Sequence, residues 1–389
     1  MRFLSSKNRW LYIATWILIF ISLAPMALAA ESEMPLETYR GVVLQVEPAE
    51  DNPLSESGYQ SEAYNVEIRL LNGPFRNQVI SVYHVTGGNP SYDIYVEPGN
   101  KVLIEAEVDG DELVSAYIAD HIRDTFTYLL IGLFALLVLL IGGKSGLRSL
   151  FSLFVTLILV AQVFLPLLLR GYQPLLLAVL LSVLAIVITM VVVAGVNRKA
   201  LAAIIGTASG VLIAGILALV FGNLTKLTGL SHEEMQMLMY IPQGVNFDYK
   251  GLLFAGIMIG ALGAVMDVGM SVASSVFEVK RVSPGITLWE LFRSGMNVGR
   301  DVMGTMTNTL ILAYLGSSTP LLLLFYAYQV PLQRILNLDT ISAELVRAFS
   351  GSIGLVAAIP LTALVAAWLA MNTKADQHET ASDLGTVRG

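Results

Sequence analysis

Long apolar runs dominate the second part of the chain and restrict its fold more than any other feature. A membrane-crossing helix needs about 20 predominantly apolar residues, and seven runs meet this requirement. With 55% hydrophobic and 14% charged residues, the composition is that of a membrane protein. We therefore predict an α-helical membrane bundle of about seven spans over residues 125–371. The spans lie near Thr125–Ile141, Ser149–Leu169, Pro174–Gly195, Ala200–Phe221, Gly251–Ser275, Val302–Tyr328 and Glu344–Met371.

The N-terminal 30 residues have the pattern of a secretory signal. Basic residues precede an apolar run from Trp10 to Ala24, and the small-residue sequence Ala27-Leu28-Ala29 follows. This pattern predicts a signal peptide over residues 1–30, with an uncleaved signal anchor as the alternative. Either one places the next segment outside the cytoplasm.

Residues 31–124 have the pattern of a small all-β domain. Five short runs rich in β-branched residues are separated by Gly, Pro, Asn and Asp, which favour turns. We expect an OB-like barrel, because closing the sheet removes exposed strand edges. The predicted strands are Tyr39–Glu47, Ala63–Leu71, Gln78–Val85, Lys101–Val108 and Leu113–Ile118.

Charge separates the two parts of the chain. Residues 31–125 hold 18 acidic and 5 basic residues, so this part carries −13 and leaves +6 for the rest of the −7 total. The acidic domain argues against nucleic acid as a partner. In the connections between spans, ten basic residues fall on one side and five on the other, which favours an extracytoplasmic β domain and a cytoplasmic tail over residues 372–389. The ten are Lys144, Arg148, Arg198, Lys199, Lys280, Arg281, Arg293, Arg300, Lys374 and Arg388, and the five are Arg170, Lys226, Lys250, Arg334 and Arg347.

Asp267 is a carboxylate in the middle of the fifth predicted span. A charged group at that depth costs a few kcal/mol or more, so it indicates a functional site. Its helical neighbours at spacings of three and four share one face with it. That face contains Gly256, Gly260, Gly263, Asp267, Ser271, Ser274 and Glu278, and we expect its glycines to allow close packing against the sixth span.

The sixth predicted span carries a second polar stripe. Because consecutive spans run in opposite directions, Asn308 lies at a depth similar to that of Asp267. We therefore predict a polar seam between the two spans, since neither stripe is expected to face lipid. The sixth span contributes Thr305 and Asn308 to the seam and Gly304 as a further close-packing glycine. Asn297, Arg300 and Asp301 join Glu278 at a cytoplasmic mouth. The seam is either a path for a proton or cation or a structural contact between the helices.

Other chemistry is not indicated. The four histidines fall in separate segments and the chain has no cysteine, so we expect neither a metal site nor a cofactor. We expect no enzymatic activity. An intramembrane aspartyl pair of Asp267 and Asp301 is a less favoured alternative.

The stretches Gly251–Ser275 and Ser294–Tyr314, with Gly316, Ser317, Ser318 and Pro320 after them, resemble the YibE/F-like family of bacterial membrane proteins. The resemblance implies an integral protein of the bacterial cell membrane with an extracytoplasmic β module. It implies no particular reaction.

Two functions follow from these observations. The first is a permease-like protein that moves a small solute or ion along the polar seam. The second is an envelope interaction or sensing protein, in which the β module binds a partner and the helical bundle anchors it or relays a signal.

Overall fold

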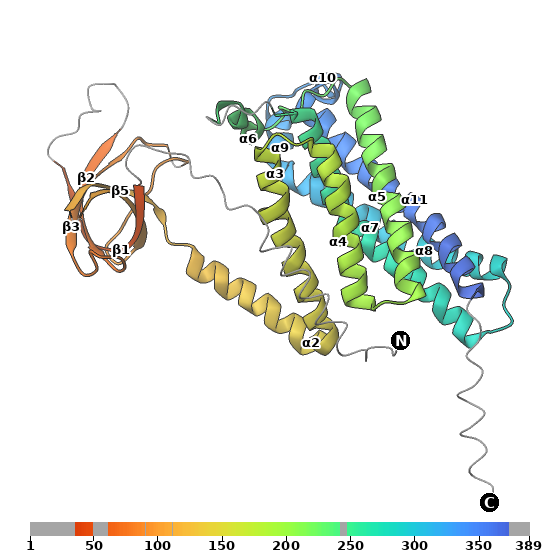
Figure 1. Ribbon diagram of the computed structural model, residues 1–389. Helices are drawn as coiled ribbons and strands as arrows, with labels where there is room; N and C mark the ends of the chain where they lie inside the picture. Colours follow the sequence, from red (N-terminus) through yellow and green to blue (C-terminus); the bar gives the residue numbers. More distant parts are fainter. Residues whose placement is uncertain (1–35, 50–60, 90, 111, 242–246, 373–389) are drawn as a thin grey trace, which may run out of the picture. The chain divides into compact units, whose positions relative to one another are not determined.

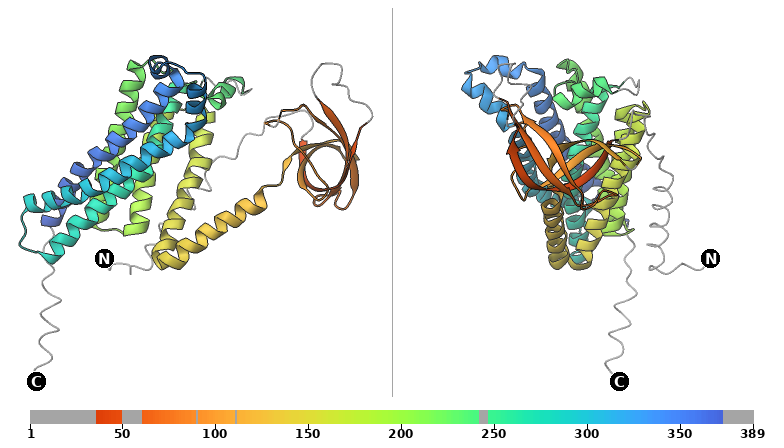
Figure 2. Two further views of the ribbon diagram at one scale, coloured as in Figure 1. Left: turned by 180° about the vertical axis from the view of Figure 1, so that it is seen from behind. Right: turned by 90° about the vertical axis from the view of Figure 1, so that its left-hand side faces the viewer.

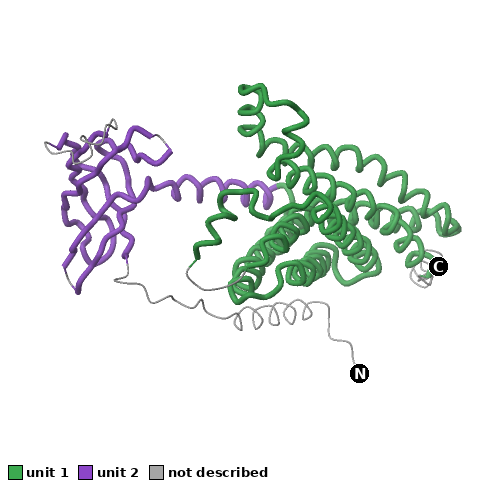
Figure 3. The backbone as a smooth tube through the Cα atoms, turned by 90° about the horizontal axis from the view of Figure 1, so that it is seen from above, with its two compact units in different colours: residues 1–27, 141–389 green, residues 28–140 purple. Residues whose placement is uncertain are grey.

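The computed structural model of the protein describes residues 36–49, 61–89, 91–110, 112–241 and 247–372. The chain divides into two compact units, residues 28–140 and residues 1–27 with 141–389 (Figure 3). The predicted signal segment and all but the first residue of the predicted tail lie outside the described residues.

The first unit contains a five-stranded antiparallel barrel. The strands are β1 (Leu36–Pro48), β2 (Glu62–Leu70), β3 (Val79–Thr86), β4 (Lys101–Asp109) and β5 (Glu112–His121). They pair in the order β3-β2-β1-β4-β5, and β3 also approaches β5, so the sheet curls into a nearly closed barrel (Figure 2). This confirms the predicted small β barrel, and each strand lies within about three residues of its predicted range.

Alternating side chains build the barrel core. Val66, Ile68 and Leu70 on β2 are fully buried, and the residues between them are exposed. Tyr39 on β1 packs edge-on against Phe75, and the ring leaves no room for a side chain at Gly73, whose φ is 78°. The loop after β2 therefore requires glycine at this position. Arg40 on β1 forms an ion pair with Asp124, the residue that opens the following helix.

The second unit is helical (Figure 1). The chain enters it through α2 (Asp124–Ile158), which begins in the first unit, and continues through a π-helical turn (Leu159–Phe164) and α3 (Leu165–Leu169). The long helices α4 (Pro174–Ala194), α5 (Arg198–Leu224), α7 (Tyr249–Val282), α8 (Leu288–Ser317) and α11 (Asp339–Met371) follow. Short elements connect them, namely α6 (Glu233–Met237), a 3-10 turn (Leu238–Tyr240), α9 (Thr319–Ala327) and α10 (Leu332–Leu336).

Among the described residues, five helical stretches are long and apolar enough to cross a membrane. Four of them correspond to α4, α5, α7 and α11, each of which coincides with a predicted span to within a few residues at either end. A sixth is obtained if α8 and α9, bent by 60° at the break between them, count as one span. The prediction of about seven spans differs because the first two predicted spans fall within one helical stretch, the 46 residues Asp124–Leu169.

Helix α11 lies at the centre of the helical packing, in contact with α5, α7 and α8. Glycines bring these backbones close together. A Cβ atom added at Gly354 of α11 would lie 2.6 Å from the carbonyl oxygen of Gly210 on α5, and one at Gly210 would lie 2.7 Å from the carbonyl oxygen of Gly354. Gly295 and Gly299 of α8 likewise lie directly against Ala363 and Ile359 of α11. Small residues at helix contacts allow the dense packing that holds helices together in lipid.

Three of the four predicted close-packing glycines have no close neighbour on another helix among the described residues. A Cβ atom added at Gly256, Gly263 or Gly304 would meet no other described atom within 4 Å, and one at Gly260 would meet only the Tyr314 hydroxyl oxygen, at 3.0 Å. The reason is the rotation of α7 about its own axis, which decides which side of the helix faces its neighbours. Val265, Val268 and Val272 form the fully buried side of α7, which turns the glycine side outward.

Candidate functional site

The polar face of α7 is the exposed face of the helix. Gly256, Gly260, Gly263, Asp267, Ser271 and Glu278 are all exposed, and Ser274 is half-buried. The fully buried residues Val265, Val268, Val272 and Val276 occupy the opposite side and belong to the main core of the helical unit. Asp267 therefore points away from that core. It makes no hydrogen bond and no ion pair with any residue that the structure describes.

The polar stripe of α8 is exposed in the same way. Its members are Asn297, Arg300, Asp301, Gly304, Thr305 and Asn308. The opposite side of α8 presents buried Leu291, Gly295 and Gly299 to the neighbouring helices. The Thr305 hydroxyl group donates to the carbonyl oxygen of Val302 at 3.0 Å, a bond within its own helix.

Helices α7 and α8 are antiparallel neighbours, as the sequence predicts. Gly295 near the start of α8 lies against Val276 near the end of α7, and Tyr314 near the end of α8 lies against Gly260 in the first half of α7. Asp267 lies between these two contacts along α7. The predicted seam residues are thus carried by adjacent helices, but their polar groups remain open at the surface of the chain and do not bond to one another.

In the part of the chain that the structure describes, the residues of the predicted cytoplasmic mouth form no ion pair or hydrogen bond with one another. Glu278 pairs with Arg281, one turn along the same helix, at 2.5 Å. Asn297, Arg300 and Asp301 are exposed on α8. In the described part of the chain, none of these three forms an ion pair or hydrogen bond with Asp267 or Glu278.

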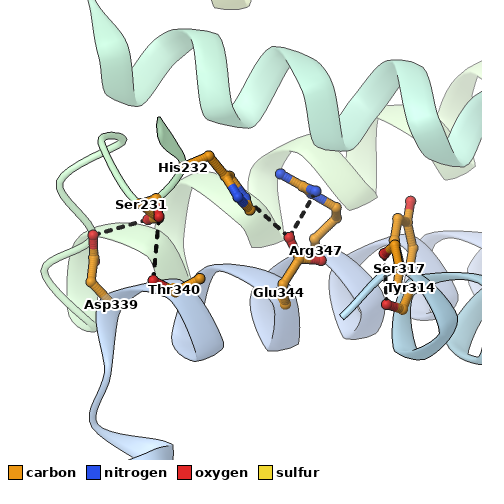
Figure 4. Close-up of polar contacts among 8 residues, drawn as sticks. All are labelled: Ser231, His232, Tyr314, Ser317, Asp339, Thr340, Glu344 and Arg347. Carbon is orange, nitrogen blue, oxygen red and sulfur yellow. Dashed lines mark hydrogen bonds and ion pairs between the residues drawn. The ribbon is translucent and has the colours of Figure 1, made fainter. Parts of the chain in front are cut away.

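A second polar cluster lies at the start of α11, and the sequence analysis did not predict it. We call Ser231, His232, Asp339, Thr340, Glu344 and Arg347 the α11 entry cluster (Figure 4). Glu344 Oε1 is 3.2 Å from His232 Nε2 and 2.9 Å from Arg347 Nη1. Ser231 and Thr228 donate their hydroxyl protons to Asp339 at 2.9 and 2.7 Å. These bonds attach the loop before α6 to α11.

Burial makes this cluster energetically important. The side chains of Glu344 and Arg347 are 12% and 23% exposed, and both Glu344 Oε2 and Arg347 Nε are buried without a hydrogen-bond partner among the described atoms. Glu344 and Tyr314 also border a cavity of about 150 Å³ between α8 and α11. The spacing of Glu344 and Arg347, one helical turn apart at the start of an apolar span, is the signal in the sequence that could have indicated this pair.

The β domain carries a pocket of its own, with a volume of about 200 Å³. It lies where β2 and β3 meet the segment before β4, and its walls include Tyr64, His84, Thr86, Tyr95 and Glu97. In the described part of the chain, no group of three or more His, Cys, Asp or Glu side chains is arranged to hold a metal ion.

The length and composition of the helices are those of a multi-helix membrane protein. The five-stranded sheet adds a small β-barrel domain, and together these features define the class of the protein. Residues 130–372 match the family described as YibE/F-like protein, and the chain belongs to this family. The match confirms the resemblance seen in the sequence. No curated protein and no solved structure matches the chain.

Proposed function

We propose that the protein is a permease-like component of the bacterial cell membrane that moves a small solute or ion, such as a proton or cation, along the polar faces of α7 and α8. The observation that carries the proposal is the open, unpaired carboxyl group of Asp267 in a membrane-length helix. An isolated carboxylate facing hydrocarbon is costly, so it is retained where it meets water, an ion or a partner.

Polar groups on both sides of Asp267 support this route. Gly260 lies two helical turns away, about 10 Å along α7 at 1.5 Å per residue, and Tyr314 packs against it. Tyr314 in turn borders the cavity that contains Glu344 of the α11 entry cluster. In the other direction, Ser271 and Glu278 continue the exposed face. These groups supply binding positions from one end of α7 toward the other.

For the topology, we propose seven crossings with the β domain extracytoplasmic and the C-terminus cytoplasmic. A straight helix of 46 residues would be about 69 Å long, more than twice the hydrocarbon thickness. The backbone leaves the helical conformation at Gly143, with φ 51° and ψ −126°, and this break supports the assignment of two spans to the stretch. The ten-to-five distribution of basic residues favours the same orientation.

Flux into proteoliposomes tests the route. Vesicles that contain the purified protein and a trapped pH-sensitive dye are given a proton gradient, and a second set is assayed for uptake of monovalent cations. We expect flux above that of empty vesicles, loss of at least about tenfold with Asp267→Asn and recovery with Asp267→Glu. Asp109→Asn, a change at an exposed turn of the β domain, is the matched control. Normal flux in an Asp267→Asn protein that inserts and elutes like the parent would overturn the proposal.

A second candidate is an envelope interaction or sensing protein. The pocket in the β domain favours it, because a cavity with aromatic and acidic walls is a typical binding feature. In this case Asp267→Asn has no effect on flux, and ligand binding to the β domain is the relevant readout.

A further inference from the structure

The walls of the β-domain pocket include aromatic and acidic side chains. Tyr64 on β2 pairs directly with His84 on β3, so both side chains project from the same side of the sheet. Tyr95 and Glu97, from the segment before β4, also line the pocket. No lysine or arginine occurs among the described residues that line the pocket.

The side-chain hydrogen-bond donors of the lining are already used. His84 Nε2 lies 2.7 Å from the carbonyl oxygen of Ile94, and because a carbonyl can only accept, this nitrogen carries the hydrogen. Thr86 donates to the carbonyl oxygen of Glu62 at 3.3 Å. The hydroxyl group of Tyr64 donates to the Glu62 carboxylate, and that of Tyr95 donates to Asp93 at 3.3 Å. The side chains therefore offer a ligand lone pairs, aromatic rings and the Glu97 carboxylate.

The acidic neighbours also keep both tyrosines neutral. The hydrogen bond to Glu62, together with burial, raises the pKa of Tyr64 above its ordinary value. Burial and the Asp93 carboxylate raise the pKa of Tyr95 in the same direction. Two neutral phenol rings with acids at their hydroxyl ends place electron-rich π systems beside negative charge, an environment that attracts cations and repels anions.

We propose that this pocket binds a small organic monocation, namely the quaternary ammonium group of a free solute such as choline. Aromatic rings bind such ions through cation–π attraction, and a nearby carboxylate adds charge complementarity. Sites for drug-sized ligands have volumes of about 300 Å³ or more, so a cavity of about 200 Å³ suits a small ligand. A metal ion would need several oxygen ligands, and Glu97 is the one lining carboxylate. The inference does not depend on transport along α7 and α8.

Calorimetric titration of the full-length protein in a maltoside detergent tests the proposal. The probes are choline and its neutral isostere, in which carbon replaces the quaternary nitrogen. We expect choline to bind at least about tenfold more tightly than the isostere, because the isostere has the shape of choline without its charge. No heat of binding with choline at millimolar concentration, or equal affinity for the two probes, would overturn the proposal.

Variants locate the binding to this pocket. Tyr95→Ala is expected to weaken choline binding by about threefold, the loss typical of one cation–π contact at a partly exposed site, whereas Tyr95→Phe keeps the ring and the affinity. Glu97→Gln removes the carboxylate and is expected to weaken binding severalfold. The matched controls are Tyr92→Ala, an 85% exposed tyrosine of the same segment, and Glu112→Gln on β5, neither of which lines the pocket. Equal effects of the pocket changes and their controls would contradict the assignment.

A last titration separates a free solute from a lipid head group. Phosphocholine carries the same ammonium group next to a phosphate, which would approach the acidic wall at Glu97. We expect it to bind several times more weakly than choline. Equal or tighter binding of phosphocholine would overturn the assignment to a free solute.

Discussion

Tyr314 of α8 lies against Gly260 of α7, and a Cβ atom at Gly260 would be 3.0 Å from the tyrosine hydroxyl oxygen. This contact and the one between Gly295 and Val276 hold the two helices side by side on either side of Asp267. The polar face of α7 is thus flanked by α8 without being covered by it.

Two glycines of the same face test this arrangement. Gly260→Val is expected to displace Tyr314 and to lower the free energy of unfolding by about 1–3 kcal/mol, the usual cost of overpacking. Gly256→Val, four residues away with nothing within 4 Å of its added Cβ atom, is expected to cause no loss. Thermal unfolding in detergent measures both. Equal destabilisation by the two changes would mean that another molecule covers the face.

The absence of cysteine allows accessibility to be measured one position at a time. A hydrophilic thiol reagent reacts with thiolates, which form in water and not in hydrocarbon. We expect Asp267→Cys to be labelled in intact vesicles. Val265→Cys, at a fully buried position, and Ile353→Cys, at an apolar surface position that is 47% exposed, are expected to remain unlabelled. Labelling of Ile353→Cys and not of Asp267→Cys would contradict a hydrated α7 face.

A disulfide tests the contact between α7 and α11. A Cβ atom added at Gly351 lies 3.3 Å from that of Ala261, close to the separation of about 3.8 Å found in disulfides. The double variant Ala261→Cys with Gly351→Cys is expected to cross-link on mild oxidation, as seen by a shift on non-reducing gels. Gly263→Cys with Gly351→Cys is the control, because Gly263 points outward. Cross-linking of this control pair would contradict the orientation of α7, in which the Gly263 side faces away from α11.

The buried ion pair of the α11 entry cluster, Glu344 with Arg347, is expected to stabilise the fold. Glu344→Gln leaves the charge of Arg347 without its partner, and breaking a buried pair costs about 3–5 kcal/mol. Because Arg347 is 23% exposed, we expect a smaller loss of about 2 kcal/mol in unfolding free energy. Glu278→Gln, which breaks the exposed pair with Arg281, is expected to cost less than about 1 kcal/mol. A loss from Glu344→Gln no larger than that from Glu278→Gln would show that the buried pair contributes little.

The raised pKa of Tyr39 leads us to expect a loss of β-domain stability at high pH. Burial, with a hydrogen bond to Glu37, raises the pKa of Tyr39 to about 12 from its ordinary value of 10.0. The folded domain favours the neutral phenol, so this stabilisation is fully present below pH 10.0 and is lost as the pH rises through about 12. Circular dichroism of the barrel between these values measures it. Tyr39→Phe is expected to flatten the pH dependence, and Tyr92→Phe, at an exposed position, to leave it unchanged.

Much of the architecture is predictable from the sequence because it depends on local patterns. Turn residues such as Gly73 and Gly99 separate the alternating runs of the barrel, and the length of each apolar run indicates the helices. The adjacency of α7 and α8 follows from their order in the chain and their short connection.

The side of α7 that becomes buried is harder to predict from the sequence. The prediction turned the Asp267 side toward α8, because polar groups avoid lipid. The structure instead buries Val265, Val268 and Val272 against α5 and α11, where Gly210 and Gly354 allow close packing. Such packing depends on residues more than 50 positions apart in the chain, which a local pattern does not specify. Glu344 and Arg347 were missed for a related reason, since charges near the end of a span are first interpreted as indicators of topology.

The central position of α11 has a consequence for biosynthesis. This helix is the last of the described long helices to leave the ribosome, so the recesses at Gly206, Gly210 and Gly295 that receive it stay empty until α11 has been synthesised. Packing of the described helices therefore waits for α11, and a nascent chain released before this helix emerges would expose these recesses to quality-control proteases.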